Sequence, residues 1–474
     1  MTMAMTMEVS TPQDVLAFAY LYGYPLYAYA QYVKTIPGAE TNVAYPFRNL
    51  ATPDDRAVVR PNVDTLYTPL FYDVSQADLE FVVPEINDRY WLWPWYDLYG
   101  NNYANVGSLQ GFKAGKYLLR YTQHNFGVQT EGVEDGYLAY VNSPTPYGML
   151  LNRILVNSRT TEDLAKVHSI QDSMSFTPVP RTTGPHENTP PLDIPSMLAT
   201  INASTPETLA ISILTLLANL HPHNPSIVPT DRETITRTLT LAGLSLPSKS
   251  FTQPPNTSLA AAITTANTLA STSRHSPHLS EKLGNNWTQP AAAVSGNFAS
   301  RYAARMFSAQ RGYLILTRDQ AAYPAYTIPR QASGADRFRI SRDEAYLVTF
   351  HSGPPRVKES GFWSLTIYGE DQFLVPNAAG VCNLGDRSGL RDLSGRVVGR
   401  QGGVKEDYGE PQVFKILIQA ADVAPPEEWV RNWLPAPAGG GVFMFSFRFY
   451  GACEAMFDGS WVYPVVEEVN ALRE

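Results

Sequence analysis

Short stretches of alternating or continuous apolar residues occupy both ends of the chain, whereas the middle follows a helical pattern. Gly, Pro, Asn and Asp separate these stretches between residues 58 and 156 and again after residue 337, as is typical of antiparallel β-structure. The expected strands are Val58–Tyr72, Leu79–Val83, Tyr90–Leu98, Tyr117–Tyr121 and Tyr137–Val141 in the first region, and Phe338–Ile340, Ala345–His351, Phe362–Tyr368, Gln412–Gln419 and Val442–Tyr450 in the second.

Helix signals appear at the start of the chain and throughout its middle. Thr11 is a good N-cap, Pro12 suits the first helical position and Asp14 places an acid in the first turn. Because Gly23 and Pro25 interrupt the apolar run that follows, we expect a kink or two short helices there. The order of β, then α, then β regions predicts separately packed domains rather than a parallel βαβ sheet.

Composition narrows the class of protein. The 474 residues are 44% hydrophobic and 12% aromatic, enough for real cores and in favour of β-rich structure. A net charge of −8 without a Lys/Arg cluster argues against a nucleic-acid partner. No signal peptide or apolar run of about 20 residues is present, so we expect a soluble cytoplasmic protein without a membrane partner.

The sequence lacks the common motifs for a hydrolase nucleophile, a nucleotide cofactor or a metal ion. The chain has no Gly-x-Ser-x-Gly elbow, no phosphate-binding Walker loop and no glycine-rich dinucleotide fingerprint. The paired histidines His221/His223 and His275/His278 lack a carboxylate at metal-ligand spacing. We therefore expect neither a metal nor an organic cofactor.

The first candidate site lies in the segment from Arg60 to Tyr67. If it is a strand, Arg60, Asn62 and Asp64 share one face, opposite Tyr67. Such a polar row suits a hydrogen-bonding site but equally a solvated face, and Pro61 places it at an edge or bend.

The second candidate is an aromatic row followed by amides. Trp91, Trp93, Trp95 and Asp97 fall on one face of a regular strand. Three indoles in a row are either plain core or a wall for a flat, apolar ligand, with Asp97 at its end. Tyr96, Asn101 and Asn102 complete this group as candidate ligand-binding residues.

Specific motifs are spread over nearly the whole chain: Tyr22–Pro25, Arg60–Tyr67, Arg89-Tyr90, Asp97, Gly148–Val156, Asp163–Asp172, Gly361–Tyr368, Phe373–Asn377, Asn432–Pro437, Arg448–Gly451 and Asp458–Trp461. In these motifs the chain resembles proteins that pair two domains of unknown function, numbered 1254 and 1214. The resemblance implies a β-sandwich-like N-terminal domain, a small helical domain and a jelly-roll C-terminal domain, but no established reaction. We accordingly expect a helical segment at 1–45, a β-sandwich-like domain at 46–157, a helical domain at 158–300 and a jelly roll at 301–474.

The leading hypothesis is a cofactor-independent enzyme acting on a small apolar or aromatic metabolite by cyclisation, elimination, isomerisation or hydrolysis, as in fungal specialised metabolism. Asp64 or Asp97 would be the acid or base, Arg60 and Asn62 would hold an oxyanion, and Tyr67 or Tyr96 would donate a hydrogen bond. Trp363 and Tyr368 of the second domain are further candidate contacts. The alternatives are a non-enzymatic small-molecule or carbohydrate binding protein and a metal-dependent oxygenase. Assembly as a homodimer stays open.

Overall fold

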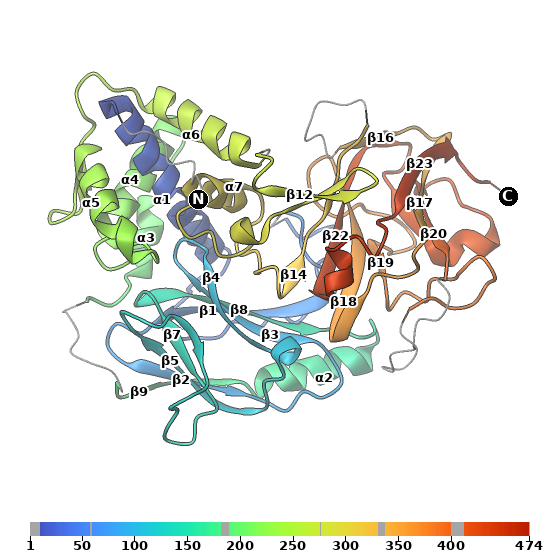
Figure 1. Ribbon diagram of the computed structural model, residues 1–474, viewed down its shortest axis with the longest axis horizontal. Helices are drawn as coiled ribbons and strands as arrows, with labels where there is room; N and C mark the ends of the chain where they lie inside the picture. The colour runs from blue at the N-terminus through green and yellow to red at the C-terminus, as the bar shows by residue number, and fades with distance from the viewer. Residues whose placement is uncertain are drawn as a thin grey trace.

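Two β-sandwiches and a layer of helices make up the chain (Figure 1). The computed structural model describes residues 10–56, 59–181, 189–274, 276–329, 337–399 and 412–473. The predicted architecture, mainly β with a helical middle, is confirmed, and none of the described sheets closes into a barrel. In Figure 1 most of the helices lie above the N-terminal sandwich, the helix at Thr161–Asp172 lies at its lower edge, and the C-terminal sandwich lies to the right.

The N-terminal sandwich consists of an inner and an outer sheet with an aromatic and aliphatic core between them. Most neighbouring strands are antiparallel and distant in sequence, such as β1 with β8 and β2 with β9, and only the β5–β7 pair is parallel. The inner sheet has the order β1-β8-β3-β4, with β1 Thr65–Asp73, β8 Tyr147–Leu155, β3 Trp91–Asp97 and β4 Asn102–Gly107. The outer sheet has the order β6-β7-β5-β2-β9, with β6 Gly127–Gln129, β7 Tyr140–Ser143, β5 Gly115–Tyr121, β2 Asp78–Val83 and β9 Ser175–Val179.

The inner sheet is buried on both faces. Every residue of β3 and β8 is buried, a pattern more typical of a covered parallel sheet than of an antiparallel sheet with one wet face. One face packs into the sandwich core, and the other packs against the helices. Polar side chains on this sheet are therefore desolvated, and each of them needs a partner or a function.

The helical layer is organised around α1, Pro12–Lys34, which contacts α4, α6 and α7. Its start is as predicted, because Thr11 and Asp14 form a reciprocal capping box. The expectation of two short helices is wrong, since α1 runs on through Pro25 as one helix. The other helices are α2 Thr161–Asp172 (beside the N-terminal sandwich), α3 Ile194–Thr200, α4 Pro206–Leu220, α5 Arg232–Leu241, α6 Leu259–Arg274 and α7 Tyr302–Arg311.

The C-terminal sandwich packs two sheets around a phenylalanine-rich core. The first has the order β14-β22-β18-β19, with β14 Ala321–Ala322, β22 Gly441–Ala452, β18 Val357–Gly369 and β19 Asn383–Gly385; β16 Phe338–Ile340 also pairs with β22. The second has the order β21-β20-β17-β23, with β21 Trp433–Ala436, β20 Phe414–Ala420, β17 Glu344–Phe350 and β23 Val465–Asn470. The short strands β10 Leu244–Ser245, β11 Ser250–Phe251, β12 Ser280–Gly284, β13 Trp287–Pro290 and β15 Ala325–Tyr326 form two small sheets.

Trp95 tests how far the N-terminal sandwich depends on its aromatic core. Its indole is fully buried and lies 4.9 Å from the Phe81 ring and 5.9 Å from the Tyr72 ring. We expect Trp95→Ala to lower the free energy of unfolding by about 3–5 kcal/mol, because it leaves a large cavity. Urea unfolding followed by circular dichroism measures this, with the exposed Leu138→Ala of the same sandwich as control. Equal effects of the two changes would contradict a core role.

Candidate functional site

The segment from Arg60 to Asp64 is a turn, which corrects the expectation of a polar row on a strand. β1 begins only at Thr65, and Arg60 has a φ of 51°. The Asn62 carboxamide oxygen accepts hydrogen bonds from the backbone N–H groups of Asp64 (2.7 Å) and Thr65 (3.0 Å). This Asx-type turn redirects the chain, so alternation of faces does not apply to these residues.

Asp64 joins the two sandwiches. Its carboxylate is 3% exposed and accepts hydrogen bonds from Ser364 Oγ (2.7 Å) on β18 and Asn383 Nδ2 (2.8 Å) on β19. Arg387 forms an ion pair with the same carboxylate. All three partners belong to the C-terminal sandwich, so Asp64 holds that sandwich against the start of β1.

Asp97 lies far from Asp64, so the two carboxylates do not share a site. Asp97 pairs with Gly148 on β8, whereas Thr65 pairs with Leu155. Seven residues of β8 separate these positions, which corresponds to roughly 23 Å. Asp97 accepts hydrogen bonds from Asn101 Nδ2 (2.7 Å) and two backbone N–H groups, and burial raises its pKa.

The amides after Asp97 are part of the same turn. Asn101 Oδ1 accepts a hydrogen bond from the Phe298 backbone N–H, and Asn102 Nδ2 donates to the Trp95 carbonyl. These bonds fix the β3–β4 turn to a neighbouring segment rather than leaving the amides available to a ligand.

The tryptophans of β3 form core rather than the wall of an open cavity. Trp91, Trp93 and Trp95 are at most 3% exposed and pack between the two sheets of the N-terminal sandwich. Trp363 is equally buried, in the core of the C-terminal sandwich. Of the two interpretations of the row, the structure therefore favours plain core packing.

On the opposite face of the inner sheet, Arg153 of β8 lies in a layer of tyrosines. Its guanidinium carbon is 5.4 Å from the centre of the Tyr67 ring on the neighbouring strand. Further phenols lie close enough to interact with it electrostatically. We call this group the Arg153 cluster: Arg153, Tyr67, Tyr90, Tyr96, Tyr323 and Tyr450, with Tyr32 of α1 at its side.

Arg153 has a buried charge without a counter-charge. It is 4% exposed, and among the described residues no carboxylate pairs with it and no recorded hydrogen bond starts from it. Its Nε and the Tyr90 hydroxyl are both buried without a partner. Tyr32, Tyr67 and Tyr323 are half-buried. Burying an arginine in this way is costly unless an anion joins it.

Four tyrosines of the cluster stay protonated at neutral pH. Burial raises the pKa of Tyr90 and Tyr450 well above the ordinary value, although Arg153 opposes this shift. Burial also raises the pKa of Tyr96 and Tyr323. The cluster thus combines a fixed cation with neutral phenols, which suits an oxyanion.

Three residues expected from the sequence belong to this cluster or touch it. Tyr67 and Tyr96 are members, and Asn62 Nδ2 donates a 2.9 Å hydrogen bond to the Tyr450 hydroxyl. The Tyr368 hydroxyl accepts a hydrogen bond from Arg448, which also donates to the Arg60 carbonyl. Arg153 is not among the residues expected from the sequence, although a lone charge inside the apolar run from Tyr147 to Leu155 is a usable signal.

A second buried arginine occupies the helical layer. Arg305 of α7 is 1% exposed and lies 4.5–4.9 Å from the ring centres of Tyr22, Tyr99 and Tyr302. Its Nη2 donates to the Tyr22 carbonyl at 3.1 Å. The hollow beside it has no room for a water molecule, so Arg305 is a packed, structural cation.

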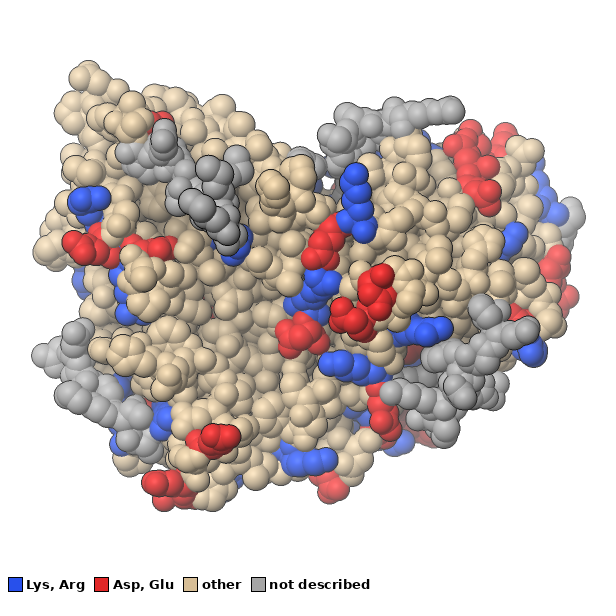
Figure 2. All heavy atoms as spheres, in the orientation of Figure 1, with Lys and Arg blue, Asp and Glu red and all other residues tan. Residues whose placement is uncertain are grey.

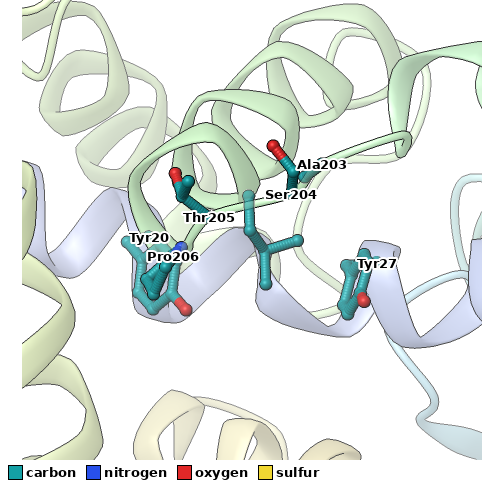
Figure 3. A pocket seen from close by; sticks show the side chains of 7 residues that line it. Tyr20, Tyr27, Ala203, Ser204, Thr205 and Pro206 are labelled. Atoms are coloured by element: carbon teal, nitrogen blue, oxygen red, sulfur yellow. The ribbon is translucent and has the colours of Figure 1, made fainter.

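Two features of the molecular surface are a hollow beside α1 and a mixed distribution of charged residues. A shallow hollow of about 290 Å³ lies between α1 and the start of α4, with Tyr20 and Tyr27 on one side and Ser204 and Thr205 on the other (Figure 3). No charged side chain lines it. On the face drawn in Figure 2, acidic and basic residues are interspersed over the C-terminal sandwich.

The described residues contain neither a metal-binding cluster nor a membrane-spanning helix. No group of three or more His, Cys, Asp or Glu side chains in the described ranges is placed to hold a metal ion. Among the helices of those ranges, none combines the length and the apolar character needed to cross a bilayer.

Comparisons with known families assign the two sandwiches. Residues 41–178 match the protein family of unknown function DUF1254, and residues 326–454 match DUF1214. The chain belongs to the family of proteins that pair these two domains. No curated protein matches the sequence.

One solved structure supports the fold, and a second was compared with it. The VPA0106 protein from Vibrio parahaemolyticus is 19% identical with a TM-score of 0.59, over 97% of this chain and all of that one. An uncharacterised protein from Burkholderia cenocepacia is 11% identical with a TM-score of 0.45, over 97% of this chain and 89% of that one. The first likeness supports the fold alone.

Asp64→Asn tests the junction between the sandwiches. The change keeps the shape but removes the charge that faces Arg387. We expect a loss of about 3–5 kcal/mol in the free energy of unfolding, as for one partner of a buried ion pair. The exposed pair of Arg473 and Asp343 provides the control, because Asp343→Asn should cost less than about 1 kcal/mol. A wild-type stability for Asp64→Asn would contradict this role.

His221 makes stability depend on pH. Burial, followed by the charge of Arg305, lowers its pKa to about 4, so the folded chain binds the proton less readily than the unfolded one. Stability is therefore full above about pH 6.5 and falls as the pH drops towards 4, by about 3 kcal/mol. Urea unfolding at both pH values should show this loss in the wild type and not in His221→Gln. Parallel losses would contradict the assignment.

Proposed function

We propose that this chain is an enzyme, without metal or organic cofactor, that binds a small, apolar or aromatic molecule with an anionic oxygen in the Arg153 cluster. The observation that carries the proposal is the buried guanidinium of Arg153 without a carboxylate or a recorded hydrogen bond among the described residues. Protein interiors rarely retain such a charge, and binding of an anion would compensate it.

The surroundings favour a flat apolar body for that ligand. The Tyr450 ring stacks on Phe362 at 4.2 Å, and the Tyr90 ring lies 5.4 Å from Tyr450. Aromatic rings in this arrangement present faces and edges to a planar substrate. A substrate carboxylate or enolate would then receive hydrogen bonds from Arg153.

The chemistry we propose is acid catalysis with stabilisation of an oxyanion. Tyr90 is the proton donor that we favour, because its hydroxyl is buried, neutral and without a protein partner. Arg153 would hold the negative charge that develops on a substrate oxygen. Cyclisation, elimination and isomerisation all pass through such charge, and general acid catalysis contributes about 10²–10⁴-fold.

Asp64, Arg60 and Asn62 receive positioning roles in place of the chemical roles expected from the sequence. Asp64 and Asn62 both contact C-terminal residues, and Asn62 reaches the cluster through Tyr450. We propose that they set the distance between the two halves of the site.

A non-enzymatic binding protein is the second candidate. The observation that favours it is that no carboxylate among the described residues bonds to a member of the Arg153 cluster, so the cluster supplies an acid without a base. A carrier needs only the cation and the aromatic rings.

Arg153→Met tests the site. We expect affinity for benzoate or a related aromatic carboxylate to fall by about 10–150-fold, as for a lost hydrogen bond to a charged group. The ligand-free variant should be at least as stable as the wild type, because an uncompensated buried charge is removed. Calorimetric titration of a panel of aromatic acids measures the affinity, and thermal unfolding measures the stability.

Arg305→Met is the matched control, since Arg305 is equally buried among tyrosines but lies in the helical layer. It should leave binding unchanged. If no acid binds the wild type, or if Arg153→Met binds as well as the wild type, the proposed site is wrong. Tyr90→Phe separates the two candidates, because loss of turnover with retained binding indicates an enzyme.

A further inference from the structure

We infer that the ligand of the Arg153 cluster carries two negative charges, such as two carboxylates on a rigid apolar frame. The inference rests on the proposed function and narrows its substrate class. It follows from a second arginine, Arg448 of β22, which lies two residues from Tyr450 and on the same face of that strand.

Arg448 is buried and has only neutral partners. It is 7% exposed, and among the described residues no carboxylate pairs with it. Its Nη1 donates to Thr366 Oγ1 (3.2 Å) and to the Tyr368 hydroxyl (2.8 Å), and its Nη2 donates to the Arg60 carbonyl (2.9 Å). A guanidinium has five N–H groups, so these bonds use three and leave two.

Both arginines act on one set of phenols. Burial raises the pKa of Tyr323 and Tyr450, and the charges of Arg153 and Arg448 both oppose that rise. Tyr67 lies close enough to interact electrostatically with both arginines. The cations therefore approach the tyrosines from opposite sandwiches. Asp64, the carboxylate at the junction, is already bound by Arg387, Asn383 and Ser364.

The number of buried arginines without a carboxylate predicts the charge of the substrate. The two arginines place two positive charges beside the tyrosines, and no described carboxylate is paired with either. A monoanion would compensate one of them, whereas a dianion would compensate both. Arginine is also the side chain best suited to two-point recognition of a carboxylate.

Terephthalate and its monomethyl ester test the inference, because they share one rigid para-substituted ring and differ by one charge and one methyl group. We expect the wild-type protein to bind terephthalate at least about tenfold more tightly in calorimetric titration. Arg448→Met should reduce terephthalate affinity to that of the ester and leave ester affinity unchanged. Arg153→Met should weaken both ligands, and Arg305→Met neither.

Equal affinity of the wild type for the two ligands would overturn the inference while leaving the proposed function intact. Binding of neither ligand, or binding that Arg153→Met does not weaken, would overturn both. If Arg448→Met does not fold, the comparison on the wild-type protein decides alone. A terephthalate preference that grows at low ionic strength would support a second charge in the site. The preference should persist at 0.15 M salt, where the Debye length is about 8 Å, because buried charges are screened less than exposed ones.

Discussion

The bonds of the Asp64 carboxylate hold together the two halves from which the candidate site is made. Asp64 comes directly before β1, and its partners lie on or just after β18 and β19. Ser364 stands opposite Arg448 in the β18–β22 ladder. Fixing Ser364 against the start of β1 therefore also fixes Arg448 and Tyr450 beside Tyr67.

A row of stacked groups extends from that junction into the cluster. The Arg387 guanidinium lies 4.7 Å from the centre of the Phe362 ring, which stacks on Tyr450. Tyr450 in turn lies next to Tyr90. Close-packed rings of this kind transmit displacements instead of absorbing them. Packed rings therefore connect Arg387, which binds Asp64, with Tyr90, the proposed proton donor.

Much of the fold could be predicted from residue pattern, because strands and helix starts are local features. The Thr11–Asp14 start of α1 and the β-rich ends of the chain are examples. The row from Arg60 to Asp64 could not be assigned correctly, since the Asn62 side chain forms a turn where alternation suggests a strand. That α1 continues through Pro25 could not be predicted either, because it depends on the packing of α1 against the other helices.

The candidate site was harder to predict, because its members are distant in sequence and share no local motif. The three tryptophans of β3 stand out in the sequence. In the structure they lie in the core, on one of the two covered faces of the inner sheet. Arg153 is a single charge in an apolar strand, and only the fold brings it near Tyr450 of the C-terminal sandwich.

The pairing of the two domains has a physical reason in this arrangement. The DUF1254 region supplies Tyr67, Tyr90 and Arg153, and the DUF1214 region supplies Arg448 and Tyr450. Each half alone would expose a cation and aromatic rings to water, where an anion gains little from either. Only the docked pair excludes water from both arginines at once. In the proposed site this exclusion of water would depend on both domains, and the buried Asp64 carboxylate lies at the junction between them.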